Sequence, residues 1–377
     1  EGSIGNLSNS GTIQGPTALR LGSSGTIGTV TNSGTIAGSI LNGASTALTI
    51  GGGAGTVVGV LTGVSGSVGG ADKGRITSTG ADLVFNSGNL LLNDDITATG
   101  RTVVNSGASL RLSNSVIVTG NYAQGATGTL VLGSGALLSV TGAATVTAGT
   151  VTSSGFNATG NYLAGGSNVT LVQGGAGSSY NTTVVAGGGI TGLGLTGSVS
   201  GNNLLAVVGN DYVGASLGSI VNSGSLSYSG ASTGAVYVAG TGSLGTLVNS
   251  GTIAGSIAVE VASGGSLGQV VNTGTISGNL VNLSTNALVL SGGTVAGTYT
   301  GGTITSTLAN VTLASGAMVL GDAVNVGAGT LVNGGASVSL NTIVSVTGNY
   351  GQTGGTLNVG ANALVVSGAA VITGGTV

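Results

Sequence analysis

Short runs in which aliphatic and polar residues alternate recur along the chain, and glycine-rich turns close each run. Arg20 lies between two leucines, and Glu260 lies between two valines in the run that corresponds to it. Because successive side chains of a strand point to opposite faces, each run places aliphatic residues on one face and polar residues on the other. Glycine and β-branched residues dominate, and no helical spacing of apolar residues persists. The pattern predicts short strands and no helices.

The chain repeats one short motif: Asn, then Ser or Thr, Gly, Thr or Ser, and Ile or Leu. Asn9 and Asn32 begin two copies that are 23 residues apart, and Asn249 and Asn272 begin two more with the same spacing. A turn followed by a β-branched run at a period of about 20–25 residues is typical of one coil of a β-solenoid. The sequence therefore predicts an all-β fold, a parallel β-helix of about 18 coils whose strands pair at a spacing of roughly 4.8 Å.

The asparagine of this motif is the candidate for a structural ladder. In a stack of coils, equivalent asparagines lie one above another, and their amides satisfy each other's donors and acceptors. The glycine two residues later is expected to supply a positive φ angle for the turn. The alternative is that Asn-Ser-Gly is only a favoured turn sequence. The predicted ladder residues are Asn9, Asn32, Asn222, Asn249 and Asn272.

Alignment of the chain with itself divides it into modules. Residues 1–62 match 241–302 at an offset of 240, whereas residues from Arg75 onward match at an offset of 228. A solenoid accepts an insertion only where a loop leaves the coil, so the missing 12 residues predict a protruding loop at 63–74. The chain begins and stops within the pattern, so we expect a segment of a longer array or a subunit capped by its neighbours. The predicted parts are a first β-solenoid module at 1–151, intermediate coils at 152–240 and a second module at 241–377.

Composition and charge exclude several classes of function. Glycine accounts for 80 of the 377 residues without a Gly-X-Y period, and the mean hydropathy of +0.55 is too high for a disordered polar chain. Five Lys and Arg residues cannot form the basic stripe that nucleic acid requires. No apolar run is long enough to cross a membrane. Because Cys and His are both absent, disulfides and the usual zinc or copper sites are excluded, and we expect no cofactor.

Asp94 and Asp95 are adjacent acids, and paired carboxylates serve β-helix lyases and glycosidases. Neighbours on a strand point to opposite faces, however, and in the second module Asp95 corresponds to an alanine and Arg101 to a glycine. We expect a solvated turn at Asp94, with a weak calcium site as an alternative. A serine triad lacks a general base here, so we expect no enzymatic activity. Arg20 and Glu260 have opposite charge at equivalent positions and are expected to point outward as solubilising residues.

Three tyrosines recur in the sequence Gly-Asn-Tyr and could form a row on one face. Exposed aromatic rings arranged in this way could stack on sugars. The plainer interpretation is that each ring covers the corner of a coil. The possible binding surface consists of the loop residues Asp72 and Lys73 together with Tyr122, Tyr162 and Tyr350.

Two segments, 118–132 and 346–359, begin with Val-Thr-Gly-Asn-Tyr and resemble the passenger-associated repeat of bacterial autotransporters. The Asn-Ser-Gly-Thr-Ile coils are similar to the same passenger domains. The resemblance implies a right-handed parallel β-helix that is secreted to the outer surface of a Gram-negative bacterium. It also implies roles in adhesion, biofilm formation and self-association.

Three functions follow as expectations. The first is a structural extracellular β-solenoid that builds a surface fibre or adhesin stalk and associates with itself end to end or laterally. The second is an adhesin passenger domain that binds a cell-surface or matrix glycan, or a host surface, through the 63–74 loop or the tyrosines. The third and least favoured is a polysaccharide-active β-helix enzyme that uses Asp94.

Overall fold

The computed structural model describes residues 2–156, 162–187 and 191–377. Within these residues the chain is all-β, without helices, and forms a parallel β-solenoid of about 16 turns. The repeat spacing predicted about 18 turns. The observed number of turns is smaller because some coils contain more residues than the repeat of the sequence. Asn42 and Ser78, for example, contact each other in successive coils although they are 36 residues apart. In the described part of the chain no helix is long and apolar enough to cross a membrane.

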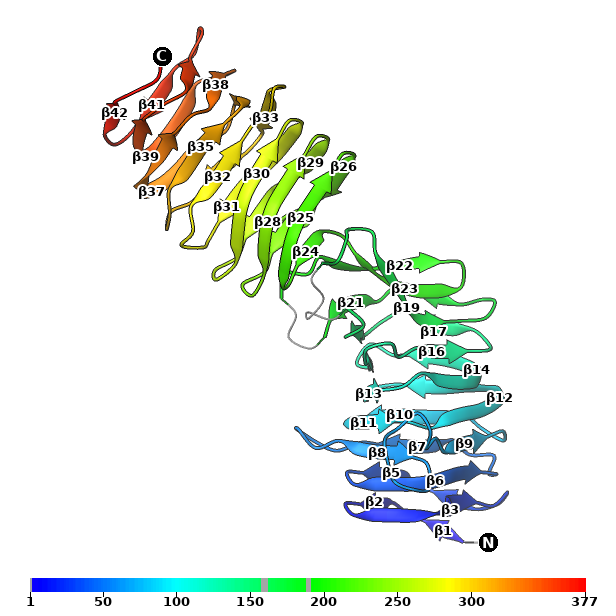
Figure 1. Cartoon of the computed structure of the whole chain (residues 1–377). Coiled ribbons are helices and arrows are strands. Elements are labelled where there is room, and N and C mark those ends of the chain that lie inside the picture. Colours follow the sequence, from blue (N-terminus) through cyan, green and yellow to red (C-terminus); the bar gives the residue numbers. More distant parts are fainter. Residues whose placement is uncertain (1, 157–161, 188–190) are drawn as a thin grey trace. The chain divides into compact units, whose positions relative to one another are not determined.

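Two compact units make up the chain, and in each unit the strands of consecutive coils pair into one large, mostly parallel sheet (Figure 1). Among the described residues, unit 1 contains a 21-stranded sheet and one separate strand pair, and unit 2 contains a 19-stranded sheet. Unit 1 comprises Glu1–Asn157, Asn168–Gly189 and Leu195–Val207, and unit 2 comprises Ala158–Ser167, Ile190–Gly194 and Val208–Val377.

Most strands are short because glycine-rich turns interrupt the chain at many corners of the coils. In unit 1 they are β1 (Ser3–Ile4), β2 (Leu7–Asn9), β3 (Thr12–Leu21), β4 (Thr26–Ile27), β5 (Thr29–Asn32), β6 (Thr35–Asn42), β7 (Leu48–Gly51), β8 (Gly59–Thr62), β9 (Arg75–Ser78), β10 (Leu83–Ser87), β11 (Asn89–Leu92), β12 (Asp95–Asn105), β13 (Ser109–Leu112), β14 (Val116–Gln124), β15 (Thr129–Leu132), β16 (Leu138–Val140), β17 (Ala144–Val146), β18 (Thr150–Ser153), β19 (Asn168–Gln173), β20 (Ser179–Tyr180), β21 (Thr183–Ala186), β22 (Leu195–Ser200) and β23 (Asn203–Val208). In unit 2 they are β24 (Asp211–Val213), β25 (Ser216–Asn222), β26 (Ser225–Tyr228), β27 (Val236–Val238), β28 (Ser243–Asn249), β29 (Thr252–Val261), β30 (Ser266–Asn272), β31 (Thr275–Asn282), β32 (Leu288–Ser291), β33 (Gly297–Thr300), β34 (Thr303–Thr305), β35 (Val311–Ser315), β36 (Ala317–Leu320), β37 (Ala323–Asn333), β38 (Ser337–Leu340), β39 (Val344–Gln352), β40 (Thr356–Asn358), β41 (Leu364–Val366) and β42 (Ala370–Ile372).

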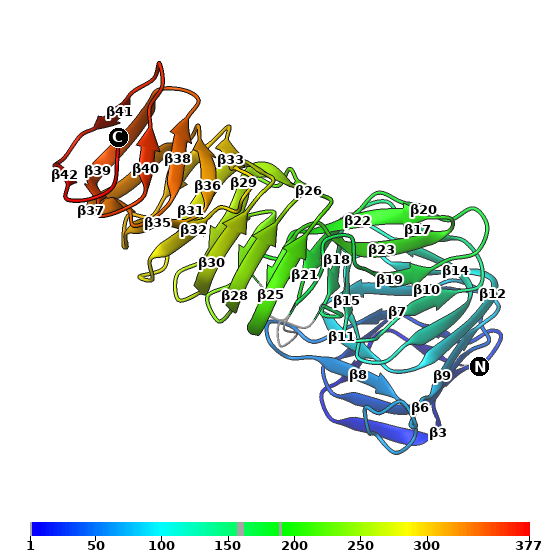
Figure 2. The ribbon, with the colours of Figure 1, turned by 45° about the horizontal axis from the view of Figure 1, so that its top comes forward.

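Three strand segments form a typical coil, as β28 and β29 illustrate. β28 contributes the first segment, and β29 contributes the other two because its pairing register shifts between Ala254 and Ile257. Both strands pair in parallel with the coil before them and with the coil after them. The register places Leu247 of one coil beside Val270 of the next. Figure 2 shows β25, β28 and β30, the first segments of successive coils, lying side by side.

The interior of each unit is a column of mainly aliphatic side chains. In unit 2, Leu247, Ile253, Val270 and Ile276 are fully buried members of this column. Full burial of a Val, Leu or Ile side chain contributes about 1.5–3 kcal/mol. Because each coil buries its inner side chains only when other coils lie above and below it, stacking is what makes the coils stable.

The internal repeat of the sequence reappears in the strand lengths. β3 and β29 contain ten residues each, β12 and β37 contain eleven, and β14 and β39 contain nine. Residues 63–74 form a loop between β8 and β9, whereas the corresponding connection between β33 and β34 is only Gly301-Gly302. The loop therefore holds ten of the twelve extra residues. The other two lie in the turn before β8, at 52–58, which corresponds to 292–296.

Candidate functional site

A column of asparagines occupies one corner of the coils in unit 2. Asn222, Asn249 and Asn272 lie at equivalent positions at the ends of β25, β28 and β30. Asn222 donates from Nδ2 to Oδ1 of Asn249, and Asn249 donates in the same way to Asn272, both at 2.8 Å. Nδ2 of Asn249 also donates to the backbone carbonyl of Thr275 at 3.1 Å. Asn249 and Asn272 are fully buried, so the column satisfies amide groups that water does not reach.

Unit 1 contains the same arrangement at Asn9 and Asn32, whose side-chain amides are joined by a 2.8 Å hydrogen bond from Nδ2 to Oδ1. Asn32 donates to the backbone carbonyl of Val60 in the next coil at 3.0 Å, as Asn9 donates to the carbonyl of Thr35 at 3.1 Å. Each of the five asparagines that the motif identifies therefore contributes its amide to a contact between coils.

The glycine two residues after each asparagine has a different role from the one expected. Gly251 and Gly274 do not have positive φ angles, so the prediction of a left-handed turn at these glycines is wrong. A Cβ atom on Gly274 would lie 2.1 Å from the carbonyl oxygen of Gly251, and one on Gly251 would lie 2.0 Å from that of Gly224. Glycine is required here because successive coils approach too closely at this corner to leave room for a side chain.

Sequence reasoning missed a second set of contacts between coils at another corner. Asn42 donates from Nδ2 to Oγ of Ser78 at 3.0 Å, and in unit 2 Asn282 donates to Ser306 at the same distance. All four residues are buried. The alignment of the two modules already paired the two asparagines, but no repeated motif pointed to serine as the partner.

The three tyrosines of the Gly-Asn-Tyr sequences do not form an exposed row. Tyr122 and Tyr350 are only 1% and 3% exposed, so the prediction that they belong to a binding surface is wrong. They are buried because they face the interior of the coil, where the hydroxyl of each donates to a glutamine, Gln124 at 3.2 Å and Gln352 at 2.7 Å. Tyr162 is 37% exposed and alone of the three can present its ring to a ligand.

Hydrogen bonds hold the 63–74 loop against the coils. Asn93, in the following coil, donates from Nδ2 to the carbonyl of Gly69 at 3.1 Å and to the carbonyl of Asp72 at 2.8 Å. Gln14, in an earlier coil, donates to the carbonyl of Val64 at 2.8 Å. The loop therefore has fixed attachments at its beginning, middle and end.

The two loop residues proposed for binding are half-buried and already have partners within the chain. The hydroxyl of Ser65 donates to the carboxylate of Asp72, and this hydrogen bond lowers the pKa of Asp72. Nζ of Lys73 lies 2.9 Å from Oδ1 of Asp95 and forms an ion pair with it. A ligand at this loop would have to compete with both contacts.

Asp94 is buried, and the prediction that it lies in a solvated turn is wrong. Its Oδ1 accepts a hydrogen bond from the backbone N–H of Gly74 at 2.8 Å, whereas its Oδ2 is buried without a hydrogen-bond partner. Burial raises the pKa of Asp94 to about 7. Asp322, its equivalent, accepts a bond from Gly302 at 2.9 Å, also has an unpartnered Oδ2, and has a pKa raised by burial. No group of three or more His, Cys, Asp or Glu side chains that could hold a metal ion occurs among the described residues.

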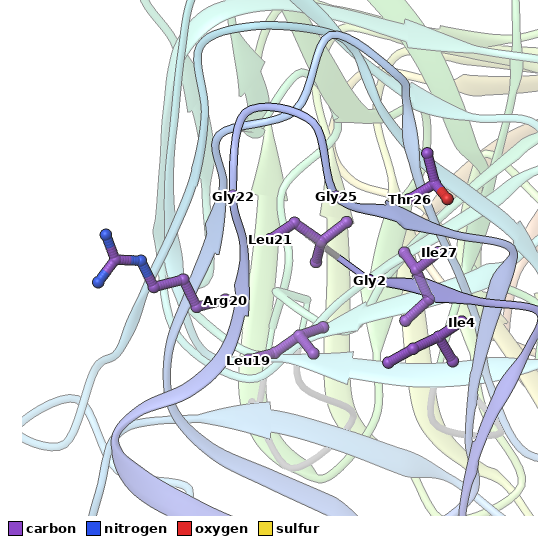
Figure 3. Close-up of a pocket in the computed structure, with 9 residues that line it drawn as sticks. All are labelled: Gly2, Ile4, Leu19, Arg20, Leu21, Gly22, Gly25, Thr26 and Ile27. Carbon is purple, nitrogen blue, oxygen red and sulfur yellow. The ribbon is translucent and has the colours of Figure 1, made fainter.

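The equivalent residues Arg20 and Glu260 differ in exposure. Arg20 is exposed and points away from the neighbouring leucines of its strand (Figure 3). Glu260 is only 9% exposed, and its Oε2 accepts a hydrogen bond from the backbone N–H of Gly234 at 3.0 Å. The prediction of a solubilising role for Glu260 is wrong, because the turn that contains Gly234 lies against it. Burial raises the pKa of this carboxyl group.

An aromatic pair on β24 and β27 was also missed. The rings of Tyr212 and Tyr237 stack with their centroids 5.8 Å apart, and Leu163 and Leu193 pack against this pair. Tyr212 and Tyr237 are paired across adjacent coils. Their separation in the sequence by the length of one coil is the signal from which this pair could have been predicted. Because segments of unit 2 itself pack against these rings, the pair stabilises the fold and does not present an open aromatic surface.

A pocket of about 260 Å³ opens at the first described coil (Figure 3). Its apolar lining consists of Ile4, Leu19, Leu21 and Ile27. In later coils, the residues at such inward positions are buried in the aliphatic column. The pocket therefore belongs to the coil interior and lacks the converging polar groups of a small-molecule site.

Comparison with known proteins provides no relative from which a function could be transferred. No protein-family model, no curated protein and no solved structure matches the chain. The functional argument must therefore start from the fold and from the side-chain contacts described above.

Proposed function

We propose that the chain is a structural, non-catalytic β-solenoid, a building block of a surface fibre or adhesin stalk. The observation that carries this proposal is how the chain uses its buried polar groups. Asn222, Asn249 and Asn272 bond to one another from coil to coil, and Asp94 and Asp322 accept hydrogen bonds from the coil before them. These groups hold successive coils together, which is what a spacer under tension needs.

The candidate catalytic groups support the same proposal. Asp94 and Asp95 do not act as a pair on one substrate-facing surface, because Asp94 is fully buried and Asp95 forms an ion pair with Lys73. A general acid or base must come within hydrogen-bonding reach of the substrate. As a direct check, Asp94→Asn should leave unchanged any polysaccharide-degrading activity found in the purified chain.

The proposed setting is the outer surface of a Gram-negative bacterium, and the proposed partner is a second copy of the chain, joined end to end or laterally. The resemblance of 118–132 and 346–359 to autotransporter passenger repeats supports this setting and a right-handed coil. The stacked-coil architecture supports self-association, because the parallel pairing that joins one coil to the next can also join coils of two copies. We propose neither a cofactor nor a nucleic-acid partner for this role.

Electron microscopy of the purified chain over a series of concentrations tests the structural proposal. We expect filaments or long stacks whose number increases with concentration. Dispersed single particles at high concentration would count against the proposal, and saturable binding of a soluble glycan by such particles would favour an adhesin instead.

A second candidate, an adhesin domain that binds a glycan or a host surface, is favoured by one observation. Charged residues concentrate around the 63–74 loop, where Asp72, Lys73, Arg75 and Asp95 lie close together in sequence or across adjacent strands. Replacement of the loop by the Gly-Gly connection of the second module separates the two functions. An adhesin that uses the loop should lose attachment to cells or glycans, whereas a spacer should be unaffected.

A further inference from the structure

The charged residues of the chain are confined to its first part and to buried positions. All five Lys and Arg residues lie between Arg20 and Arg111. After Arg111 the sequence contains only three charged residues, Asp211, Glu260 and Asp322, which are 7%, 9% and 1% exposed. Among the described residues from 112 onward, the outer surface therefore presents almost no charge, and it consists mainly of Gly, Ser, Thr, Asn and aliphatic side chains.

One outer face in unit 2 carries a set of valines, which we call the valine face. Val221, Val248 and Val271 are paired with one another across β25, β28 and β30. Val271 is paired with Ser291, so this first column of valines ends at β30. A second column lies two residues along the strands, where Val289 and Val332 are both paired with Thr312 across β32, β35 and β37. The valine face consists of Val221, Val248, Val271, Val289, Val332 and Val371.

The side chains of the valine face are accessible. Val221 and Val371 are 68% and 54% exposed, and the other four are half-buried. Except for Val371, each of these valines follows or precedes a buried core residue such as Leu247 or Val270, so the alternation of the strand directs it outward. At Val371 the neighbouring residues Ala370 and Ile372 are exposed as well.

The first module shows that the coil itself does not require these valines. The positions equivalent to Val248, Val271, Val289 and Val371 are Ser8, Thr31, Thr49 and Thr145, which lie on β2, β5, β7 and β17. These strands pair in parallel from coil to coil with polar residues at the outward positions. Val332 corresponds to Val104, and Thr312 corresponds to Val84, so the outer surface differs between the modules at Val248, Val271, Val289 and Val371 and not at Val332.

We propose that the valine face docks against the valine face of a second copy of the chain, so that two coil stacks lie side by side. This inference rests on the proposed structural function and adds the surface by which copies associate laterally. A charged partner would have to bury an unpaired ion against this face, which is unfavourable. A second copy presents a neutral surface of the same shape, and parallel rows of β-branched residues can interdigitate as two stacked sheets do.

The size of the face predicts how strong this contact is. Eight strands at a spacing of roughly 4.8 Å and two outward positions per strand give an area on the order of 500 Å² per copy. Stable complexes usually bury about 800 Å² per partner. A single pair should therefore be weak and concentration-dependent, and it becomes strong only when many copies are held together in one fibre.

Sedimentation velocity of the full chain over a wide concentration range tests the proposal. The double variant Val248→Lys with Val271→Lys puts two charges on the valine face. Its matched control is Thr252→Lys with Thr275→Lys, which puts two charges at half-buried outward positions on the next face of the same two coils. Circular dichroism confirms that each variant is folded.

We expect the mean sedimenting mass of the wild type and of the threonine variant, Thr252→Lys with Thr275→Lys, to rise with concentration. The valine variant, Val248→Lys with Val271→Lys, should stay monomeric up to concentrations at least tenfold higher than those at which the wild type associates. Val248→Ser with Val271→Thr installs the residues of the first module and should weaken association without adding charge. Equal loss of association in both lysine variants, or a wild type that stays monomeric throughout, would overturn the proposal.

Electron microscopy of the same variants separates this proposal from the proposed function. Filaments that persist in the valine variant but no longer bundle support both the fibre function and the valine face. If the wild type forms side-by-side pairs that the valine variant lacks, and neither forms filaments, the valine face is supported and the fibre function fails. Bundles that are unchanged in the valine variant overturn the valine face alone.

Discussion

Asp94 and Asp322 occupy equivalent corners of the two modules, and each accepts a hydrogen bond from a glycine N–H of the preceding coil while its second oxygen is buried without a partner. A charged carboxylate is poorly satisfied in this position, and a protonated one is favoured. The same acid in the same environment in both modules indicates a structural position. The preference of the buried acid for its protonated form also makes the stability of the chain depend on pH.

We predict that the folded chain loses stability as the pH rises from about 4 to about 8. The pKa of Asp94 in the folded state is about 7, above its ordinary value of 3.8, because burial disfavours the charged form. Over this range the folded state retains a proton that the unfolded state has released. The stabilisation is complete below about pH 3.8 and is lost as the pH rises through about 7, and it amounts to a few kcal/mol at most. Urea unfolding at pH 5 and pH 8 measures this loss of stability.

Asp94→Asn isolates this contribution, because asparagine keeps an oxygen acceptor for Gly74 but does not titrate. The difference between the urea midpoints at pH 5 and pH 8 should shrink in this variant. Asp82→Asn, which changes an exposed acid, serves as the control and should retain the difference of the wild type. A wild type that becomes more stable with rising pH, or an Asp94→Asn variant with an unchanged difference, contradicts the assignment.

Close contact between coils at the asparagine corner makes a second prediction. Gly274→Ala places a Cβ atom against the carbonyl oxygen of Gly251 and should destabilise the fold by about 1–3 kcal/mol or more. Gly224 belongs to the same motif, but a Cβ atom there would meet nothing within 4 Å. Gly224→Ala should therefore be close to neutral in thermal unfolding. Equal effects of the two substitutions would show that the turn conformation, and not the distance between coils, requires glycine.

The asparagine column itself makes a third prediction. Asn249→Ala removes the hydrogen bonds that Asn249 makes with Asn222 and Asn272 inside the stack, which should cost about 1–3 kcal/mol. Asn222→Ala removes a half-buried residue at one end of the column and should cost less. Denaturant unfolding of both variants measures the difference, and a neutral Asn249→Ala would mean that the column does not stabilise the stack.

The repeating features of the sequence were sufficient to predict the solenoid. Asn249 and Asn272 return at the spacing of one coil, and a residue that returns at that spacing must lie beside its copy once the coils stack. Contacts between acidic side chains and the turns of the preceding coil could not be predicted in this way. Asp94 is buried because the backbone of Gly74 lies against it, as Gly302 lies against Asp322, and Glu260 is covered by the turn of Gly234. These contacts depend on loop conformations that no periodicity encodes.

The inserted loop makes a fourth prediction. In the second module Gly301-Gly302 closes the same connection that residues 63–74 close in the first. Replacement of 63–74 by Gly-Gly, with Asn93→Gly to match the second module, should leave the circular dichroism spectrum unchanged, because Gly302 already provides the N–H that Gly74 provides to the buried acid. The ion pair of Lys73 is partly exposed, so its loss should change stability by at most about 1 kcal/mol. Unfolding of the graft would show that the loop is part of the core.

Cryo-electron microscopy of the purified chain tests the central claim most directly, since it shows whether successive coils stack in register. We predict strands that repeat at roughly 4.8 Å along each unit, with Asn222, Asn249 and Asn272 superposed in one column. A map in which the chain folds as a β-sandwich, or in which these three asparagines lie at different corners, would contradict the account.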